Sequence, residues 1–204
     1  MLTVALPKGR IAEDTLKIFS QIFGDDFIFE DRKLILQTGN FKFLMVRNQD
    51  IPVYVTNGAA DIGVVGLDVL EEHKPEVVRL MDLGIGKCRV CIGIRQDEEL
   101  DYSLPEIKVA TKMPNISKAY FAKKAIAANI IKLYGSIELA PLVDLADIIV
   151  DVVETGNTMK QNGLKVAETI MESSAHLIAN KTSYIVKRDQ VFDLFYKISK
   201  LIKS

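Results

Sequence analysis

Ala146-Asp-Ile-Ile-Val-Asp-Val-Val-Glu-Thr-Gly-Asn-Thr158 joins an apolar run to a cluster of turn-forming residues. The run from Ile148 to Val153 predicts a buried strand that contains one acid, Asp151. It stops at residues 154–158, whose Thr, Gly and Asn favour turns and helix N-caps. Such a turn can hold a phosphate, because Gly lets the backbone approach the anion while hydroxyls and helix N–H groups donate to it. Asp151 and Glu154 would then suit ribose hydroxyls or a divalent cation.

The competing interpretation of this stretch is an ordinary strand-to-helix connection with a Thr N-cap. Taken alone, the stretch fits that interpretation better, because five-residue turn motifs recur by chance. The rest of the chain therefore decides between them.

Length and composition fit a globular protein with one domain or two small lobes. The chain has 204 residues, of which 49% are hydrophobic and 26% charged, so a sizeable core is available. A net charge of −1 gives no support for a nucleic-acid or membrane-surface protein. The N-terminus has no basic region before an apolar core, and no apolar run approaches the roughly 20 residues that span a bilayer. We expect a soluble, cytoplasmic protein without nucleic-acid or membrane partners.

The two cysteines, Cys88 and Cys91, form a C-x-x-C pair, which occurs in redox and zinc sites. They lie in a run that reads as a strand, where residues three apart point to opposite faces and cannot chelate one ion. We expect them to pack in the core.

A second strand–turn–helix passage lies at the N-terminus. The strand Leu2–Leu6 ends at Pro7-Lys8-Gly9-Arg10, and the helix that follows has apolar residues at a 3.6-residue period. Lys8 and Arg10 either line an anion site or are solvated turn residues.

Two more such passages follow. A strand over 60–66 ends at Gly66-Leu67-Asp68, where Asp68 is placed as an N-cap or a ribose ligand. A strand at Ile107–Ala110 leads into Thr111-Lys112-Met-Pro-Asn115, and a helix is expected over 117–128 with Asn115 or Ser117 as its N-cap.

Strands and helices alternate along the whole chain, which predicts α/β architecture with ligands at the carboxyl ends of strands. Further strands are expected at 27–29, 33–37, 41–46, 77–81, 89–94, 164–169 and 175–179, with a final helix at 188–202. Four polar strand ends fit an active-site cleft between two lobes. We expect residues 1–86 plus 182–204 to form one lobe and residues 87–181 the other.

Five motifs now resemble a known family: Ala5–Arg10, Val46–Pro52, Gly58–Asp68, Ala110–Asn115 and Asp151–Thr158. Their order and spacing are similar to those of ATP phosphoribosyltransferase, the enzyme of the first committed step of histidine biosynthesis. The similarity covers essentially the whole chain, and the length resembles the short form.

That resemblance implies a two-lobed fold like a periplasmic binding protein, a homodimer, and a hetero-octamer with a regulatory subunit similar to histidyl-tRNA synthetase. It implies that ATP and 5-phosphoribosyl 1-pyrophosphate (PRPP) react to give N1-(5-phosphoribosyl)-ATP and pyrophosphate, with Mg²⁺ required. The nucleophile is a ring nitrogen, so no Ser, Cys or strong base is needed.

The same resemblance assigns roles to individual residues. The catalytic candidates are Arg32, Arg47, Asp151 and Glu154. PRPP is assigned to Asp151, Glu154, Thr155, Gly156, Asn157 and Thr158, and ATP to Lys8, Gly9, Arg10, Gly66, Leu67, Asp68, Thr111 and Lys112. Both arginines are expected on the leaving group, where Arg offers a bidentate fork, although each could be a solvated surface charge.

Two details of these assignments stay open. An arginine placed like Arg32 is thought, in the family, to reach in from a neighbouring subunit. Val150 stands where the general PRPP motif has another acid, so magnesium is expected mainly on the substrates rather than on the loop.

Two other functions remain possible from the sequence. One is a non-catalytic, two-lobed cytoplasmic protein that binds an anion or another small molecule. The other is a phosphoribosyltransferase that uses a different base.

Overall fold

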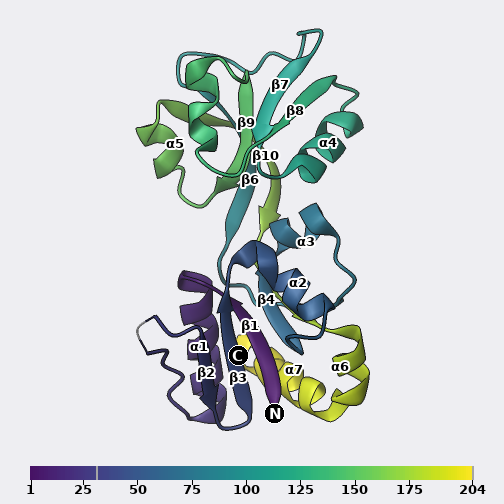
Figure 1. The fold of residues 1–204 in the computed structure, drawn as a ribbon. Helices are drawn as coiled ribbons and strands as arrows, with labels where there is room; N and C mark the ends of the chain where they lie inside the picture. Colours follow the sequence, from purple (N-terminus) through teal and green to yellow (C-terminus); the bar gives the residue numbers. More distant parts are fainter. Residues whose placement is uncertain (31, 204) are drawn as a thin grey trace. The chain divides into compact units, whose positions relative to one another are not determined.

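The computed structural model describes residues 1–30 and 32–203, and its chain forms two compact units (Figure 1). Unit 1 comprises Met1–Leu70, Lys74–Gly86 and Ser174–Ser204, and unit 2 comprises Glu71–His73 and Lys87–Ser173. Across the described ranges, no helix is both long enough and apolar enough to cross a bilayer.

Unit 1 is built on a six-stranded sheet with the order β2-β3-β1-β4-β11-β5. The strands are β1 (Leu2–Pro7), β2 (Ile35–Thr38), β3 (Phe41–Val46), β4 (Ile62–Gly66), β5 (Val78–Asp82) and β11 (Ala175–Ala179). Strands β3, β1 and β4 run parallel, and the register pairs Pro7 with Val46. Their carboxyl ends therefore meet at one edge of the sheet.

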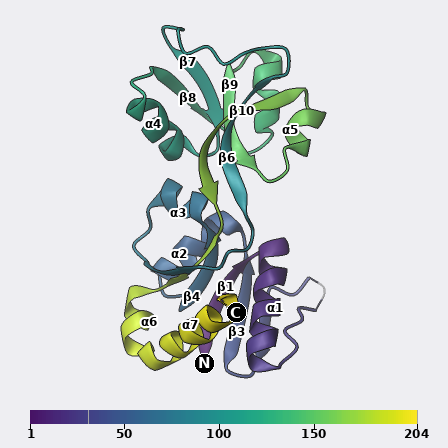
Figure 2. The same ribbon diagram turned by 180° about the vertical axis from the view of Figure 1, so that it is seen from behind.

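Helices cover both faces of this sheet. Helices α1 (Arg10–Phe23) and α7 (Arg188–Ile202) share one apolar cluster with the strands, and Figure 2 shows both on the same side. Helices α2 (Ile51–Thr56) and α3 (Leu67–His73) contribute to the cluster on the other face. The short helices η1 (Asn48–Asp50) and α6 (Lys181–Val186) complete the unit.

Residues 27–29, expected as a strand, form no regular element. Phe27 is instead buried edge-on against Phe19 and Phe43, with ring centroids 6.0 and 5.3 Å away. This apolar fragment anchors a loop to the core, and it has no strand partner there.

Unit 2 is built on a five-stranded sheet with the order β10-β6-β9-β7-β8. The strands are β6 (Cys88–Arg95), β7 (Ile107–Thr111), β8 (Ala128–Lys132), β9 (Ile148–Val153) and β10 (Leu164–Ser173). Strands β8, β7 and β9 run parallel, so their carboxyl ends also share an edge. Cys91 is fully buried among apolar residues of this unit, as expected, whereas Cys88 at the start of β6 is only half-buried.

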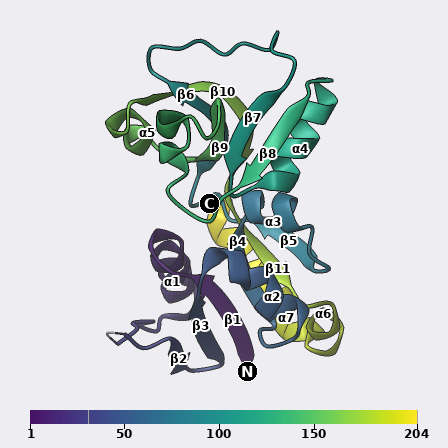
Figure 3. The same ribbon diagram turned by 45° about the horizontal axis from the view of Figure 1, so that its top comes forward.

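Helices again flank the parallel strands (Figure 3). Helix α4 (Pro114–Lys123) packs on one face, whereas α5 (Asn157–Gln161) and the turns η2 (Ile137–Leu139) and η3 (Pro141–Val143) pack on the other. The helix expected at 117–128 thus begins and ends earlier. Its N-cap is Met113, not Asn115 or Ser117, because Pro114 takes the first helical position.

The expected boundary at 181/182 lies too late in the chain. The structure divides the two units between Ser173 and Ser174. Strand β11 pairs antiparallel with β4 and with β5, which places it inside the sheet of unit 1. An isolated apolar strand does not reveal which sheet it joins, since that depends on long-range pairing.

Candidate active site

Lys112 and Asp151 are brought together at the carboxyl edge of the unit 2 sheet. Lys112 follows β7, and Asp151 lies within β9. These two strands are parallel neighbours, and their register pairs Thr111 with Val150. Lys112 Nζ lies 3.0 Å from Asp151 Oδ1. From the sequence we expected Lys112 on ATP and Asp151 on PRPP, whereas the fold makes the two side chains an ion pair.

Asp151 lies on an otherwise apolar face of β9. Ile149 and Val153, two residues away on either side, point to the same face and are buried in one cluster with Met159 of α5. Asp151 itself is only 7% exposed. A carboxylate at this depth requires a partner charge or hydrogen bonds, because its desolvation is costly.

Thr111 is fully buried and uses its hydroxyl within the protein. Its Oγ1 donates to the carbonyl of Val150 (2.7 Å) and accepts the backbone N–H of Met113 (2.9 Å). The side chain that we assigned to ATP therefore fixes the turn on which Lys112 stands.

The predicted phosphate loop leads from β9 into the single-turn helix α5. Gly156 is the N-cap of that helix and has φ 83° and ψ −2°, a left-handed conformation that favours glycine. No side chain caps α5, so the Thr N-cap of the competing interpretation is absent. Thr155 Oγ1 accepts a weak hydrogen bond from the Asn157 backbone (3.4 Å), and Thr158 is exposed.

Helix α4 starts directly after the Lys112 turn, and its N-terminus is occupied by Glu72. The Glu72 carboxylate accepts the backbone N–H groups of Asn115 (3.0 Å) and Ile116 (2.9 Å). Asn115 Nδ2 donates in return to the Glu72 carbonyl (2.9 Å). A buried acid thus satisfies first-turn N–H groups that have no acceptor within the helix.

Unit 1 gathers its own predicted residues at the carboxyl edge of β1, β3 and β4. The Lys8 backbone N–H donates to the carbonyl of Val46 (3.1 Å), which places Lys8 beside Arg47 at the end of β3. Gly9 has φ 96° and ψ −155°, which only glycine adopts readily. Arg10 begins α1, and its Nε lies 3.7 Å from Asp14 one turn later.

The end of β4 brings Gly66, Leu67 and Asp68 to the same edge. Asp68, in the first turn of α3, is 8% exposed and folds back so far that a Cβ on Gly66 would collide with its carboxylate. The Gly66 N–H donates to Asn48 Oδ1 at 3.5 Å. Any larger residue at position 66 would therefore have to displace the Asp68 carboxylate.

Both predicted arginines are exposed. Arg47 precedes η1 in an extended conformation. Strand β2 begins beside the carboxyl end of β3, as the bond from Met45 N to the Leu34 carbonyl shows (2.8 Å). The chain just before β2, with Arg32 at φ 60°, comes to the same edge of the sheet.

The predicted residues therefore form two groups. One group, in unit 1, comprises Lys8, Gly9, Arg10, Arg32, Arg47, Gly66, Leu67 and Asp68; the other, in unit 2, comprises Thr111, Lys112, Asp151 and residues 154–158. Sequence analysis missed Glu72 and Asn48, which hold these turns through contacts distant in the sequence. Asn48 lies within a motif that we quoted, whereas Glu72 had no local signal.

The acids of unit 2 do not fit a metal site of their own. Residues 1–30 and 32–203 contain no group of three or more His, Cys, Asp or Glu side chains placed to hold an ion. Asp151 carries the Lys112 ammonium on one oxygen, so a divalent ion on this carboxylate would face a positive charge.

Comparison with known proteins gives concordant matches. The family model described as "HisG: ATP phosphoribosyltransferase" matches residues 47–200. The ATP phosphoribosyltransferase of Campylobacter curvus is 75% identical over 202 residues, covering 99% of this chain and 98% of that protein. That of Helicobacter hepaticus is 54% identical over 204 residues, covering 100% of both.

Solved structures agree on the fold. The ATP phosphoribosyl transferase (HisG:HisZ) complex from Thermotoga maritima contains a chain that matches with a TM-score of 0.84 at 33% identity, covering 100% of this chain and 99% of that one. The periplasmic aliphatic sulphonate binding protein SsuA from Escherichia coli matches with a TM-score of 0.65 over 98% of this chain and 72% of its own. At 10% identity, this second match shows the two-lobed α/β fold alone.

Proposed function

Because the chain belongs to the ATP phosphoribosyltransferase family, we propose that it transfers the phosphoribosyl group of PRPP to N1 of ATP. The bond from N1 to the anomeric carbon forms as the bond from that carbon to pyrophosphate breaks. The products are N1-(5-phosphoribosyl)-ATP and pyrophosphate, as in the first step of histidine biosynthesis. We place the reaction in the cytoplasm.

The observation that carries this proposal is the acid Asp151, held beside Lys112 and followed directly by the 154–158 loop. The reaction needs alignment of two substrates and stabilisation of a cationic sugar, and it needs no protein nucleophile. Asp151 and Glu154 suit the ribose hydroxyls and the developing positive charge. The loop from Thr155 to Thr158 suits the 5-phosphate.

The group in unit 1 supplies positive charge for the phosphates. Arg47 and Arg32 are proposed for the departing pyrophosphate, because guanidinium is permanently charged and binds phosphate oxygens in pairs. We propose that Arg32 comes from a neighbouring subunit of a homodimer. Lys8, Arg10 and Asp68 are proposed around ATP, with Gly9, Gly66 and Leu67 shaping their turns.

Magnesium is proposed to enter on the phosphates of the substrates. Phosphate oxygens and water satisfy its octahedral preference, and the charge on Lys112 disfavours a second cation on Asp151. Bound there, the ion would neutralise the leaving group.

The proposed partner is a regulatory subunit similar to histidyl-tRNA synthetase, in a hetero-octamer. The Thermotoga structure, a HisG:HisZ complex, motivates this part of the proposal. We propose that the chain responds to histidine only through that partner, and direct binding of histidine to the isolated chain would contradict this.

The test is incubation of the protein with ATP, PRPP and Mg²⁺, with and without pyrophosphatase, while following the near-ultraviolet absorbance of N1-substituted adenine. Pyrophosphatase should increase product by removing a product of a reversible reaction. A protein that binds PRPP yet forms no product, even with the regulatory subunit present, would be a binding protein rather than this enzyme.

A further inference from the structure

We propose that Lys112 is the fixed counter-ion of Asp151, holding one oxygen of the carboxylate so that the other is presented to a ribose hydroxyl of PRPP. This inference rests on the proposed function, because it refines the acid that we place on the ribose. It replaces the expectation that Lys112 contacts ATP with a positioning role through Asp151.

The backbone fixes Lys112 where this role requires it. Thr111 bonds through one hydroxyl both to the Val150 carbonyl on β9 and to the Met113 N–H beyond Lys112. The turn is thereby tied to β9 on one side of Lys112, through Thr111, and the backbone on the other side is held to the same hydroxyl. The register pairs Ala110 with Ile149, and both are buried in the same cluster. Lys112 comes two residues after Ala110, just beyond the end of β7, and Asp151 comes two residues after Ile149 within β9.

Burial explains why Asp151 needs such a partner. Its side chain is 10% exposed, against 34% for Lys112. The acid is thus embedded in the apolar face, while the side chain of Lys112 keeps about a third of its surface exposed. An ionised carboxylate there is costly unless an opposite charge lies beside it.

The two carboxylate oxygens are not equivalent. Oδ1 lies 3.0 Å from the Lys112 ammonium in an ion pair and accepts the backbone N–H of Val152 at 2.8 Å. Within residues 1–30 and 32–203, Oδ2 has no such partner. A carboxylate held at one oxygen offers the other as a directed acceptor, which suits a hydroxyl better than a metal ion that needs several oxygen ligands.

The pair accounts for the Val150 position, where the general PRPP motif has an acid. A second carboxylate would attract a divalent ion to the loop, whereas here a lysine ammonium supplies the neighbouring positive charge from β7. The magnesium of the reaction then has to arrive on substrate phosphates.

A double-mutant cycle tests this inference in the full chain, alone and with the proposed regulatory subunit. PRPP dissociation constants are measured by calorimetry with Mg²⁺ and without ATP for the wild type, K112M, D151N and K112M/D151N. We expect K112M to weaken PRPP binding about tenfold, or about 1.4 kcal/mol. The double variant should bind no more weakly than D151N, because Lys112 acts only through Asp151.

Two results would overturn the inference while leaving the proposed function intact. One is K112M binding PRPP as the wild type does. The other is additive losses in the double variant, which would mean that Lys112 touches the ligand itself. A wild type that binds no PRPP in either setting would overturn the proposed function and this inference together.

Three variants guard against a purely structural effect. K112R keeps the charge and should recover most of the affinity, and K112Q repeats the cycle should K112M fold poorly. K132M removes a lysine at the end of β8, whose ammonium lies 5.3 Å from the centre of the Tyr134 ring. It should bind PRPP like the wild type.

Discussion

The Glu72 carboxylate accepts the backbone N–H of Asn115 at 3.0 Å, joining the end of α3 to the start of α4 across 43 positions of sequence. The same carboxylate accepts the next N–H, that of Ile116, at 2.9 Å. A buried acid thereby does what a local N-cap residue does in other helices.

Replacing Glu72 by alanine should loosen the start of α4, because the buried N–H of Ile116 and the partly buried N–H of Asn115 lose their acceptor. The expected loss of stability is about 1–3 kcal/mol. Hydrogen exchange of the backbone amides of residues 115–121 measures this loss of stability at the start of α4. As a control, Glu76→Ala removes an acid that is 78% exposed and should leave those amides unchanged. Wild-type protection of α4 in the Glu72 variant would contradict the capping role.

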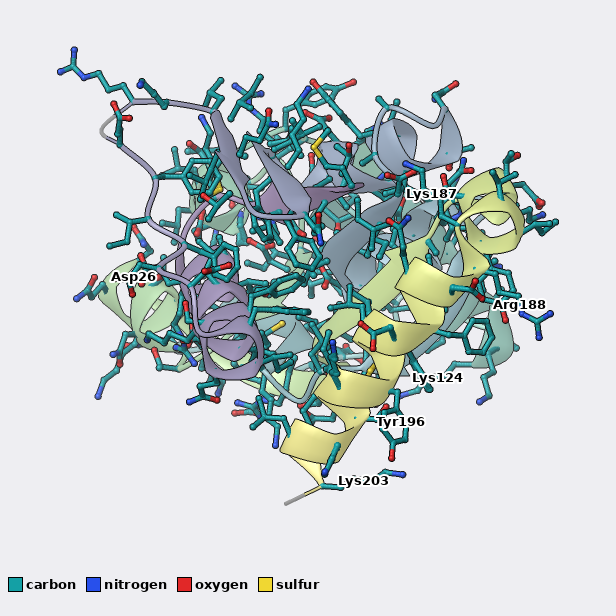
Figure 4. The ribbon with its side chains drawn as sticks, turned by 90° about the horizontal axis from the view of Figure 1, so that it is seen from below. Asp26, Lys124, Lys187, Arg188, Tyr196 and Lys203 are labelled. Carbon is teal, nitrogen blue, oxygen red and sulfur yellow. The ribbon has the colours of Figure 1, made fainter. Side chains whose placement is uncertain are left out.

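Asp61 should make the stability of unit 1 depend on pH. Its Oδ2 accepts from the Lys187 ammonium (2.7 Å) and from the Thr3 backbone (2.8 Å), and Oδ1 accepts from Ser183 (2.7 Å). Figure 4 shows Lys187 at the start of α7. Burial raises the pKa of Asp61, but these bonds outweigh it and lower the pKa below its ordinary value. The stabilisation is therefore present above the unfolded pKa and is lost as the pH falls through the folded one.

Asp61→Asn should accordingly cost about 3 kcal/mol at neutral pH. The difference from the wild type should shrink as the pH falls below about 4, where the unfolded carboxyl takes up a proton. Urea unfolding at several pH values measures both. Asp193→Asn, which removes an exposed partner of Lys197, should change stability by less than about 0.5 kcal/mol at every pH. A stability difference between Asp61→Asn and the wild type that stays constant with pH would contradict this role of the Asp61 carboxylate.

Thr158 and Arg47 should affect different kinetic constants. Thr158→Ala removes a hydroxyl proposed for the 5-phosphate and should raise the KM for PRPP roughly tenfold. Arg47→Ala removes charge from the departing pyrophosphate and should lower kcat roughly a hundredfold. Steady-state kinetics separates the two, with Arg47→Lys as the charge-keeping control. Unchanged kinetics in both variants would mean that the site is misplaced.

If Arg32 acts in the active site of the neighbouring subunit, an Arg32 variant and an Arg47 variant should restore activity to each other in mixed dimers. Mixed dimers of Arg32→Ala and Arg47→Ala chains would contain one site with both arginines intact. Equal mixing of two inactive variants should then restore about a quarter of wild-type activity, given random pairing. Mixtures that stay inactive after confirmed subunit exchange would place Arg32 outside the partner's site.

Local pattern was enough to predict most elements. The apolar run Ile148–Val153 became β9, the 3.6-residue period after Gly9 became α1, and the final stripe became α7. These signals are local because burial of one face follows directly from residue spacing.

The sequence did not predict the features that depend on tertiary contacts. The sheet that β11 joins, the use of Phe27 as an anchor, and the capping of α4 by Glu72 all depend on residues far away in the chain. At the site, the motifs identified Lys112 and Asp151 but not that they form a pair, because the register of β7 and β9 sets their distance. Resemblance suggested roles for single residues, and the contacts between them came from the fold.

Phosphorus NMR of the reaction tests the central claim most directly. With ATP, PRPP and Mg²⁺, and with the regulatory subunit present, PRPP should disappear and release one pyrophosphate for each ATP converted. The triphosphate chain of ATP should stay intact, because the bond forms at N1 of the base. Cleavage of that triphosphate, or PRPP that persists beside unchanged ATP, would contradict the assignment.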